Sequence, residues 1–499
     1  MSKPTATAAE LPTLVSTGIS GFDDILCGGF PSNRVYLVHG NPGAGKTTLA
    51  LQYLLEGVRQ GEKGLYVTLS ETKDELLEVS RSHGWSLDAI HIYEMVTTEQ
   101  DLETDNQYTM YQPSEVELSV TTKAILAEFE EHKPTRVVLD SLSEIRLLAQ
   151  NPLRYRRQIL ALKQYFAGRQ CTVLLLDDKT SEVGDLKLES ITHGVINLEQ
   201  VAQDFGCARR RLSITKMRGR KYRGGYHDFV IERGGLQVFP RLVAAEHNES
   251  FGTGQLKSGI KELDALVGGG IEFGTNVLLI GPAGSGKSTM AIQYAVAEAA
   301  KGNRSAIFAF DERIQTILDR TYGLGIDLKK YYESGHITIK TIDPAELSPG
   351  ELAHSVRRAA EGTDGHGPAK VIVIDSLNGY LNAMPEERFL IIQLHELLAY
   401  LGHKGVVSFL VIAQHGLLSA MQSPLDTSYL ADSIILFRYF EMGGEVKQLI
   451  SVVKKRSGYH ERTLREFKLI DKKGIFIGEP LHKFDRVLTN NPVLKEVLG

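Results

Sequence analysis

The hydrophobic and polar positions of this chain follow two alternating patterns. Short apolar runs rich in β-branched residues, such as "RVVLD" and "TVLLLD", predict strands. Between them lie stretches such as "TLALQYLLEGVRQ", in which apolar residues recur with the spacing of a helix. Nearly continuous apolar strands that alternate with helices are typical of a mainly parallel sheet covered on both faces. The pattern therefore predicts an α/β fold.

The same pattern occurs twice along the 499 residues. The segment "STGISGFDDILCGGFPSNRVYLVHG" in the first half matches "KSGIKELDALVGGGIEFGTNVLLIG" in the second over its whole length. Other pairs follow in the same order, among them "TRVVLDSLSEI" and "KVIVIDSLNGY". Polar and glycine-rich residues interrupt the periodicity at 244–254. We therefore expect a tandem duplication with domains at residues 1–246 and 247–499.

Each half contains the pattern G-x-x-x-x-G-K-[ST] directly after an apolar run. Glycines let such a loop curl so that backbone N–H groups point at phosphate oxygens, and the following helix offers its positive amino end. The lysine neutralises the charge of the β- and γ-phosphates, and the hydroxyl group ligates Mg²⁺. We therefore expect ATP and Mg²⁺ to bind at two loops. Their residues are Gly40, Asn41, Pro42, Gly43, Ala44, Gly45, Lys46, Thr47 and Thr48, and Gly281, Pro282, Ala283, Gly284, Ser285, Gly286, Lys287, Ser288 and Thr289.

Two aspartates end later apolar runs, one in each half. Asp140 follows "RVVL" and Asp375 follows "VIVI". A strand that ends in this way can deliver its carboxylate to the Mg²⁺ ion of a P-loop. We expect these aspartates, together with Thr47 and Ser288, to be the metal-binding residues. The alternative is that each aspartate only caps the turn that follows it.

Two glutamates follow the strand that comes after each P-loop helix. Glu71 and Glu312 would lie at the carboxyl edge of the sheet, where ligands bind in such folds. We interpret each as the general base that polarises the water attacking the γ-phosphate. The alternative is a solvent-exposed glutamate in the first turn of a helix, where acidic residues are favourable.

These features together carry a resemblance to a known family. The paired halves, the segment "TGISGFDDILCGGFP", the glutamate after the second strand and a late K-x-R pattern resemble the KaiC family of circadian-clock ATPases and autokinases. The resemblance covers nearly the whole chain. It implies two tandem RecA-like P-loop NTPase domains and a homohexameric double ring with ATP between subunits. Members commonly carry adjacent acids at the base position, so Asp311, beside Glu312, is a further catalytic candidate, whereas the first half has Ser70–Glu71.

The stretch "ARRRLSITKMRGRKYRGGYH" is the one strongly basic segment. In it Lys216 and Arg218 stand two residues apart on a predicted strand, hence on one face, and Lys454 and Arg456 repeat this spacing. We favour the interpretation that each pair stabilises the γ-phosphate charge of a neighbouring subunit, as the resemblance implies. A solvent-exposed strand edge and a nucleic-acid contact are the alternatives. The role of the other cations at 209–223 stays open.

One segment of the second half concerns phosphorylation. In the resembling family it carries adjacent serine and threonine acceptors, with another threonine slightly upstream. This chain has Ser428, then Tyr429 in place of the threonine, and Ser423 at the upstream position. We expect autophosphorylation on Ser428, with Ser423 as the second choice. Whether Tyr429 blocks or replaces the second acceptor stays open, and the alternative is that Ser428 is only a polar turn residue.

Composition narrows the classes of partner and compartment. The formal net charge of −5 gives no overall basic field to attract nucleic acid. The first residues, "MSKPTATAAELPTL", contain no apolar core of signal-peptide length, and no run of about eighteen apolar residues occurs along the chain. The three cysteines, Cys27, Cys171 and Cys207, are far apart and suit a reducing compartment. We expect a soluble cytoplasmic protein that binds neither membranes nor nucleic acid.

The resemblance also bears on partner proteins. The chain ends at "KFDRVLTNNPVLKEVLG", soon after the point where clock-type members continue into a tail that binds KaiA. We therefore do not expect KaiA dependence, and a KaiB-like partner stays open. Our interpretation is a KaiC-like ATPase and autokinase that acts as an ATP-driven timer or switch. The rivals are a RecA/DnaB-like DNA-handling motor and an ATP-dependent scaffold with little turnover.

Overall fold

A computed structural model describes residues 13–95, 113–179, 188–203, 206–363, 365–382, 390–414, 428–442, 444–481, 484–485 and 493–494. The chain divides into two compact units, Met1–Arg241 and Leu242–Gly499. The exact place of the join between two domains stays a prediction. No helix in the described ranges is both long and apolar enough to cross a membrane.

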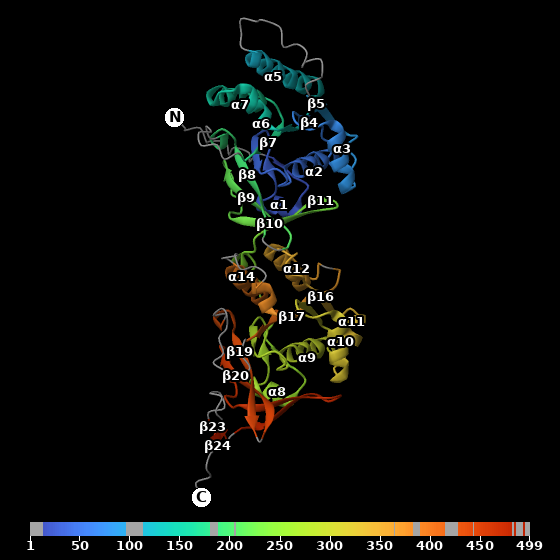
Figure 1. Ribbon diagram of the computed structural model, residues 1–499, viewed down its shortest axis with the longest axis vertical. Helices are drawn as coiled ribbons and strands as arrows, with labels where there is room; N and C mark the ends of the chain where they lie inside the picture. The colour runs from blue at the N-terminus through green and yellow to red at the C-terminus, as the bar shows by residue number, and fades with distance from the viewer. Residues whose placement is uncertain are drawn as a thin grey trace, which may run out of the picture. The chain divides into compact units, whose positions relative to one another are not determined.

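The first unit is built on one large sheet (Figure 1). Its strands are β3 (Val35–Gly40), β4 (Gly64–Thr68), β5 (Ile90–Glu94), β6 (Arg136–Asp140), β7 (Thr172–Asp178), β8 (Gly194–Val201), β9 (Arg209–Met217), β10 (Tyr226–Glu232) and β11 (Gly235–Phe239). Their order is β11-β10-β9-β8-β3-β7-β6-β4-β5. The strands from β8 to β5 are parallel, and β9 to β11 continue the sheet in antiparallel pairs. A separate antiparallel pair is formed by β1 (Leu14–Val15) and β2 (Phe30–Pro31).

Helices cover both faces of this sheet. One face packs against α1 (Ser20–Ile25), α2 (Lys46–Arg59) and α3 (Lys73–His83), and the other against α5 (Pro113–His132), α6 (Leu142–Ala149) and α7 (Pro152–Ala167). A short 3₁₀ helix, η1, spans Leu188–Ser190. In β3, Tyr36 and Val38 enter one core while Val35 and Leu37 enter the other, because successive side chains of a strand alternate. Both faces are buried, which explains why the strand is apolar throughout.

The second unit repeats this architecture. Its strands are β14 (Asn276–Gly281), β15 (Arg304–Ala309), β16 (Ile337–Thr341), β17 (Ala369–Asp375), β18 (Val407–Ala413), β19 (Ser433–Met442), β20 (Glu445–Lys455), β21 (Arg465–Ile470) and β22 (Gly474–Pro480). The order is β16-β15-β17-β18-β14-β19-β20-β21-β22. Read from β22 to β16, it matches the order of the first sheet from β11 to β5. Two small antiparallel pairs are β12 (Gln255–Leu256) with β13 (Ile271–Glu272), and β23 (Phe484–Asp485) with β24 (Val493–Leu494).

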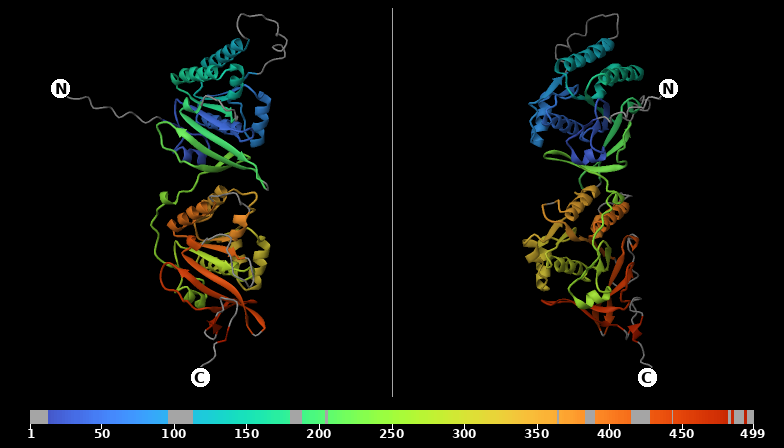
Figure 2. Two further views of the ribbon diagram at one scale, coloured as in Figure 1. Left: turned by 60° about the vertical axis from the view of Figure 1, so that its left-hand side comes forward. Right: turned by 180° about the vertical axis from the view of Figure 1, so that it is seen from behind.

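Helices also cover both faces of the second sheet (Figure 2). One face packs against α8 (Lys261–Leu266), α9 (Lys287–Ala299), α10 (Ile314–Gly323) and α11 (Leu328–Glu333), and the other against α12 (Pro349–Glu361), α13 (Leu377–Asn382) and α14 (Leu390–His403). Two 3₁₀ helices are η2 (Ala244–Glu246) and η3 (Ser428–Leu430). The predicted fold class, two tandem RecA-like α/β domains with mainly parallel sheets, is confirmed.

Candidate active sites

The first P-loop joins β3 to α2. Gly43 and Gly45 adopt left-handed φ angles of +78° and +97°, which favour glycine. A Cβ atom at Gly45 would lie 2.6 Å from the side chain of Ile231, so a larger residue would also lack space. The buried Lys46 ammonium donates to the Gly40 carbonyl oxygen across 2.9 Å. The loop therefore curls around the lysine head group and leaves its backbone free to approach a phosphate.

The second P-loop joins β14 to α9 with the same geometry. Gly284 and Gly286 have φ angles of +75° and +93°. Lys287 Nζ donates to the carbonyl oxygens of Gly281 and Pro282 across 2.9 and 2.6 Å. Burial lowers the pKa of Lys287 to about 8. The ammonium is therefore still mainly protonated at pH 7, as a phosphate ligand must be.

In each unit a strand-end aspartate lies beside the hydroxyl group that follows the P-loop lysine. Thr47 Oγ1 donates to Asp140 Oδ2 across 3.4 Å, and Ser288 hydrogen-bonds Asp375. Tyr66 also donates its hydroxyl proton to Asp140. Burial raises the pKa of both aspartates, and a bound cation would favour their ionised form. A hydroxyl and a carboxylate oxygen are ligands that Mg²⁺ prefers, so these residues fit the ion.

Glu71 follows β4 and lies near Asp140. Thr68 Oγ1 donates to the Glu71 carbonyl oxygen across 2.6 Å and accepts the Glu71 N–H across 3.1 Å, which fixes the loop. Glu71 Oε2 is buried and forms no hydrogen bond with any described residue. Burial, and then the charge of Asp140, raise the pKa of Glu71. A carboxylate with a raised pKa and an unused oxygen can accept a proton from a bound water.

Glu312 has different neighbours in the second unit. Arg320 Nη2 donates to Glu312 Oε2 across 2.8 Å, and Arg320 Nη1 donates to Thr289 Oγ1 across 3.1 Å. The adjacent Asp311 accepts a hydrogen bond of 2.5 Å from Ser376 Oγ. Both acids line an open hollow of about 460 Å³ at the end of β15. The carboxylate of Glu312 is thus accessible but held by a cation.

Both units match one family model, described as "ATPase: KaiC", over residues 15–243 and 256–482. This chain belongs to the KaiC family. The circadian clock protein KaiC3 of Synechocystis sp. is 27% identical over 96% of this chain and 94% of its own length. The circadian clock oscillator protein KaiC of Synechococcus elongatus is 27% identical, with 95% of this chain and 91% of that protein covered. The resemblance predicted from the motifs is confirmed. The family is one of ATPases, which implies that its members bind ATP.

One acidic residue beside the first P-loop of this KaiC-family chain was not predicted from the sequence. Asp178 ends β7, and its Oδ1 lies 2.7 Å from Lys46 Nζ. Ser143 Oγ donates to the other carboxylate oxygen across 3.2 Å. The strand register places Ala413 at the matching position beside the second P-loop. In the sequence, only the two aspartates that end the run "TVLLLDD" pointed to this residue. Its contact with Lys46 becomes visible only when β7 is known to pair with β3.

The K-x-R pairs of the KaiC-family units lie away from the P-loop of their own unit. Lys216 pairs in register with Val195 of β8, whereas Gly40 of the P-loop pairs with Leu198. Three strand residues separate the two levels by about 10 Å. In the second unit Lys454 likewise pairs with Ile434, at the amino end of β19. Neither pair belongs to the phosphate site of its own unit.

Within its unit, the first pair holds the segment before β8. Lys216 Nζ donates to the Glu189 carbonyl oxygen, and Arg218 Nη2 donates to the Ser190 carbonyl oxygen across 2.7 Å. The sequence placed both cations on one strand, but β9 ends at Met217 and Arg218 follows it. The pair is therefore anchored at a strand end.

The second pair holds the equivalent segment of its own unit. Lys454 Nζ donates to the Ala431 carbonyl oxygen across 2.9 Å. Arg456 Nη2 donates to the Tyr429 carbonyl oxygen across 3.1 Å. This segment begins with Ser428, the first residue of η3. In both units the lysine and the arginine of the pair thus hydrogen-bond to the segment just before β8 or β19. These two strands are the neighbours of the P-loop strands β3 and β14.

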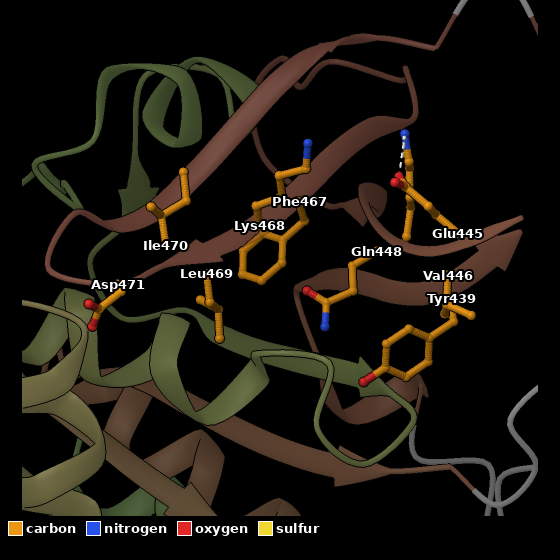
Figure 3. Close-up of a pocket in the computed structure, with 10 residues that line it drawn as sticks. Tyr439, Glu445, Val446, Gln448, Phe467, Lys468, Leu469, Ile470 and Asp471 are labelled. Atoms are coloured by element: carbon orange, nitrogen blue, oxygen red, sulfur yellow. Dashed lines mark ion pairs between the residues drawn. The ribbon is translucent and has the colours of Figure 1, made fainter. Parts of the chain in front are cut away.

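A second hollow, of about 510 Å³, borders the second P-loop (Figure 3). Tyr439 donates its hydroxyl proton to the Ala283 carbonyl oxygen across 3.2 Å, and Gln448 Nε2 donates to the Gly284 carbonyl oxygen across 3.3 Å. The ring of Phe467 forms part of the wall. The other lining residues are Glu445, Val446, Lys447, Lys468, Leu469, Ile470 and Asp471. Its size is that of a small-molecule site.

The basic run of the first unit is partly folded into the sheet. Arg209 is only 8% exposed. The guanidinium of Arg211 lies over the ring of Tyr226 at 5.1 Å from its centroid. At least these two cations make contacts within the unit and do not form an open basic surface.

Proposed function

We propose that this chain is a Mg²⁺-dependent ATP hydrolase that works as a homohexameric double ring, and that its second unit also phosphorylates Ser428. One observation carries the proposal. In each unit the P-loop lysine, the adjacent hydroxyl group, a strand-end aspartate and a glutamate meet at the carboxyl edge of one sheet. Mg²⁺, when bound at the hydroxyl and the aspartate, would neutralise charge that develops on the γ-phosphate.

The remaining steps of hydrolysis use residues of the chain. Lys46 and Lys287 hold the β- and γ-phosphates, and the loop N–H groups bind the phosphate oxygens. Glu71 or Glu312 accepts a proton from the attacking water as its oxygen bonds to the γ-phosphorus and the bond to ADP breaks. The hollow beside the second P-loop is the proposed place of the nucleoside, with the Tyr439 ring as an apolar wall.

The position of the K-x-R pairs supports the proposed ring. Because each pair lies away from its own P-loop, it can approach a γ-phosphate only in a neighbouring copy. A head-to-tail contact of this kind closes into a ring when the rotation between copies closes. Six copies are the number that the family resemblance implies. The cations would then supply the charge stabilisation that a finger residue gives in trans.

The same contact would bring Ser428 to a neighbouring nucleotide. Arg456 holds the backbone of Tyr429, so a cation pair that reaches the γ-phosphate carries this segment with it. In the proposed step, Glu312 of the adjacent subunit accepts the Ser428 hydroxyl proton, the oxygen bonds to the γ-phosphorus, and ADP leaves. The side chain of Ser428 is not described, and Ser423, the second choice, lies outside the described residues.

The proposed partners follow from the family and from the site. A timing or switching role is proposed because the relatives are named circadian clock proteins. A KaiB-like protein is the candidate partner, and we expect neither KaiA dependence nor nucleic-acid binding. The partly buried basic run gives no support to a DNA-handling motor.

The test uses the purified full chain, Mg²⁺ and γ-labelled ATP, with free phosphate and protein-bound label followed separately. We expect both products, with the label mapped to Ser428. Ser428→Ala should lose most of the label but keep the phosphate release of the first unit. Stimulation by single-stranded DNA would instead select the DNA-handling motor. Nucleotide-gated assembly without phosphate release would select the scaffold.

Asp178 gives a prediction about the first site alone. ATP must displace this carboxylate from Lys46 and then tolerate its charge, so Asp178→Ala should tighten ATP binding by roughly twofold to fivefold, the range of a partly exposed ion pair. The measurement is titration with a fluorescent ATP analogue in a chain whose second site carries Lys287→Ala. The reverse exchange, Ala413→Asp with Lys46→Ala, should weaken the second site. Weaker binding after Asp178→Ala would mean that the carboxylate orders the loop for ATP.

A further inference from the structure

A group of metal-ligand side chains lies on the first unit, apart from the nucleotide site. His91 on β5 and Glu128 and His132 in the last turns of α5 come together there. One ligand atom from each residue lies within 4.8 Å of the others. Within the described ranges, it is the one group of three or more His, Cys, Asp or Glu residues that meets so closely. β5 is the edge strand, four strands or about 19 Å from β3 and its P-loop.

The two histidine nitrogens converge on one carboxylate oxygen. Glu128 Oε2 lies 3.0 Å from His91 Nε2 and 3.5 Å from His132 Nδ1. In a tetrahedral zinc site with bonds of about 2.0–2.1 Å, neighbouring ligand atoms are about 3.4 Å apart. The two distances from Glu128 Oε2 are thus close to the edges of such a tetrahedron. To bind a shared ion, His132 Nδ1 would leave its contact with the Glu128 carbonyl oxygen at 3.1 Å, and the two rings, which stack with centroids 3.6 Å apart, would shift.

The sequence explains how the group is held. Glu128 and His132 are four residues apart on α5 and therefore share one face of the helix. His91 comes from the neighbouring strand β5, so the third ligand belongs to a different element. All three side chains are roughly one third exposed or less, at 36%, 22% and 32%. The group is therefore partly enclosed and still open to an ion from solvent.

We propose that His91, Glu128 and His132 form a binding site for a late first-row divalent cation, Zn²⁺ foremost, with a fourth position for water. Two imidazoles and one carboxylate are a ligand set that zinc sites use. Imidazole nitrogen also suits Co²⁺ and Ni²⁺, whereas Mg²⁺ prefers oxygen ligands. The ion would therefore be distinct from the Mg²⁺ that accompanies ATP.

The second unit has no such group at the matching place. Thr338 stands at the register position of His91, because β15–β16 pairing repeats that of β4–β5. Helix α12 ends at Glu361, as α5 ends at His132, and Arg357 precedes that end by four residues, as Glu128 does. Arg357 Nε lies 3.6 Å from Glu361 Oε1. The guanidinium of Arg357 stands where the Glu128 carboxylate stands in the first unit, and it would repel a cation. We therefore expect one ion per chain, bound in the first unit.

The ion would join β5 to the carboxyl end of α5. This helix also packs against α6, which follows Asp140 closely along the chain. A metal bond between strand and helix would therefore add a fixed point to the layer that covers the α5–α7 face of the first sheet. Metal binding stabilises whichever state holds the ligands together, here the folded first unit.

The experiment titrates the purified full chain, freed of metal with a chelator, with ZnCl₂ by calorimetry and with CoCl₂ by visible absorption. One Zn²⁺ per chain, a higher unfolding temperature of the first unit and the strong visible bands of tetrahedral Co²⁺ are expected. His91→Asn, Glu128→Gln and His132→Gln should each weaken binding by about tenfold or more, since loss of an outer-shell partner alone costs that much. His83→Gln on α3 is the matched control and should keep one bound ion.

Two results would overturn the proposal. The first is a wild-type chain that takes up no equivalent of Zn²⁺ and gives no tetrahedral Co²⁺ spectrum, which does not depend on any variant folding. The second is Zn²⁺ binding that survives all three substitutions in chains whose circular dichroism is native, because the ion would then be held elsewhere. In either case the group is an ion pair between Glu128 and the two histidines.

Discussion

Replacing Lys216 and Arg218 together by alanine is expected to lower ATP hydrolysis in the first unit by about a hundredfold or more, while nucleotide binding survives. The reason is that loss of a cation in trans removes charge stabilisation from the transition state but leaves the P-loop intact. Phosphate release is measured in a chain that also carries Glu312→Gln, so that the second unit contributes little. Lys221→Ala, which removes a cation from the same basic run, is the control and should leave turnover unchanged.

Mixing variants tests whether the cations act on a neighbour. Chains with Lys216→Ala and Arg218→Ala are exchanged with chains that carry Glu71→Gln, each nearly inactive alone. In mixed rings, some sites combine an intact glutamate from one subunit with intact cations from the next, so activity should return. If it stays absent after subunit exchange is demonstrated, the pair does not act across a subunit boundary, and its role is to hold the Glu189–Ser190 backbone.

Glu71→Gln is expected to remove most of the phosphate release of the wild-type chain, a loss of about a hundredfold or more in the first unit. Glu312→Gln should instead keep most of the phosphate release and abolish the label on Ser428. The difference follows from the neighbours. Glu71 has a raised pKa and a free buried oxygen, whereas Arg320 occupies the carboxylate of Glu312. The ion pair thus holds a carboxylate oxygen of Glu312 that would otherwise face an attacking water.

The same γ-labelled assay distinguishes the two sites. Label on Ser428 and free phosphate are quantified in each single variant and in the double variant, with nucleotide binding as the check on folding. Val79 stands in the first unit where Arg320 stands in the second, so Arg320→Val is the matched exchange and should raise hydrolysis in the second unit. Equal losses of phosphate release in the two glutamine variants would contradict the assignment of hydrolysis mainly to the first unit.

The fold and the motif residues could be predicted because their signals are local. A P-loop is readable from nine residues, since glycines at positions of positive φ, a lysine and a hydroxyl must follow one another. Asp140 ends a strand and Glu71 follows one, so their edge of the sheet is known once the strands are known to be parallel. The repetition of every signal in the second half made the interpretation firm.

The features that distinguish the two units could not be predicted in the same way. Asp178 meets Lys46 only because β7 lies beside β3, although more than a hundred residues separate them. Arg320 reaches Glu312 across the start of α10, a spacing of eight residues that matches no helical pair rule. The K-x-R cations bind backbone carbonyl oxygens, which carry no sequence signature. Order of strands and geometry of loops decide these contacts.

The ion pair between Lys46 and Asp178 has a consequence for how the chain would respond to the energy supply of a cell. One site has a carboxylate that would compete with ATP for Lys46, and the other has Ala413 in its place. As the ATP concentration falls, the first site would empty while the second is still filled. A chain with two such thresholds passes through three states of occupancy, both sites filled, one filled and none. Its occupancy would therefore report a falling ATP concentration in steps, and the first step would come before the second site loses its ATP.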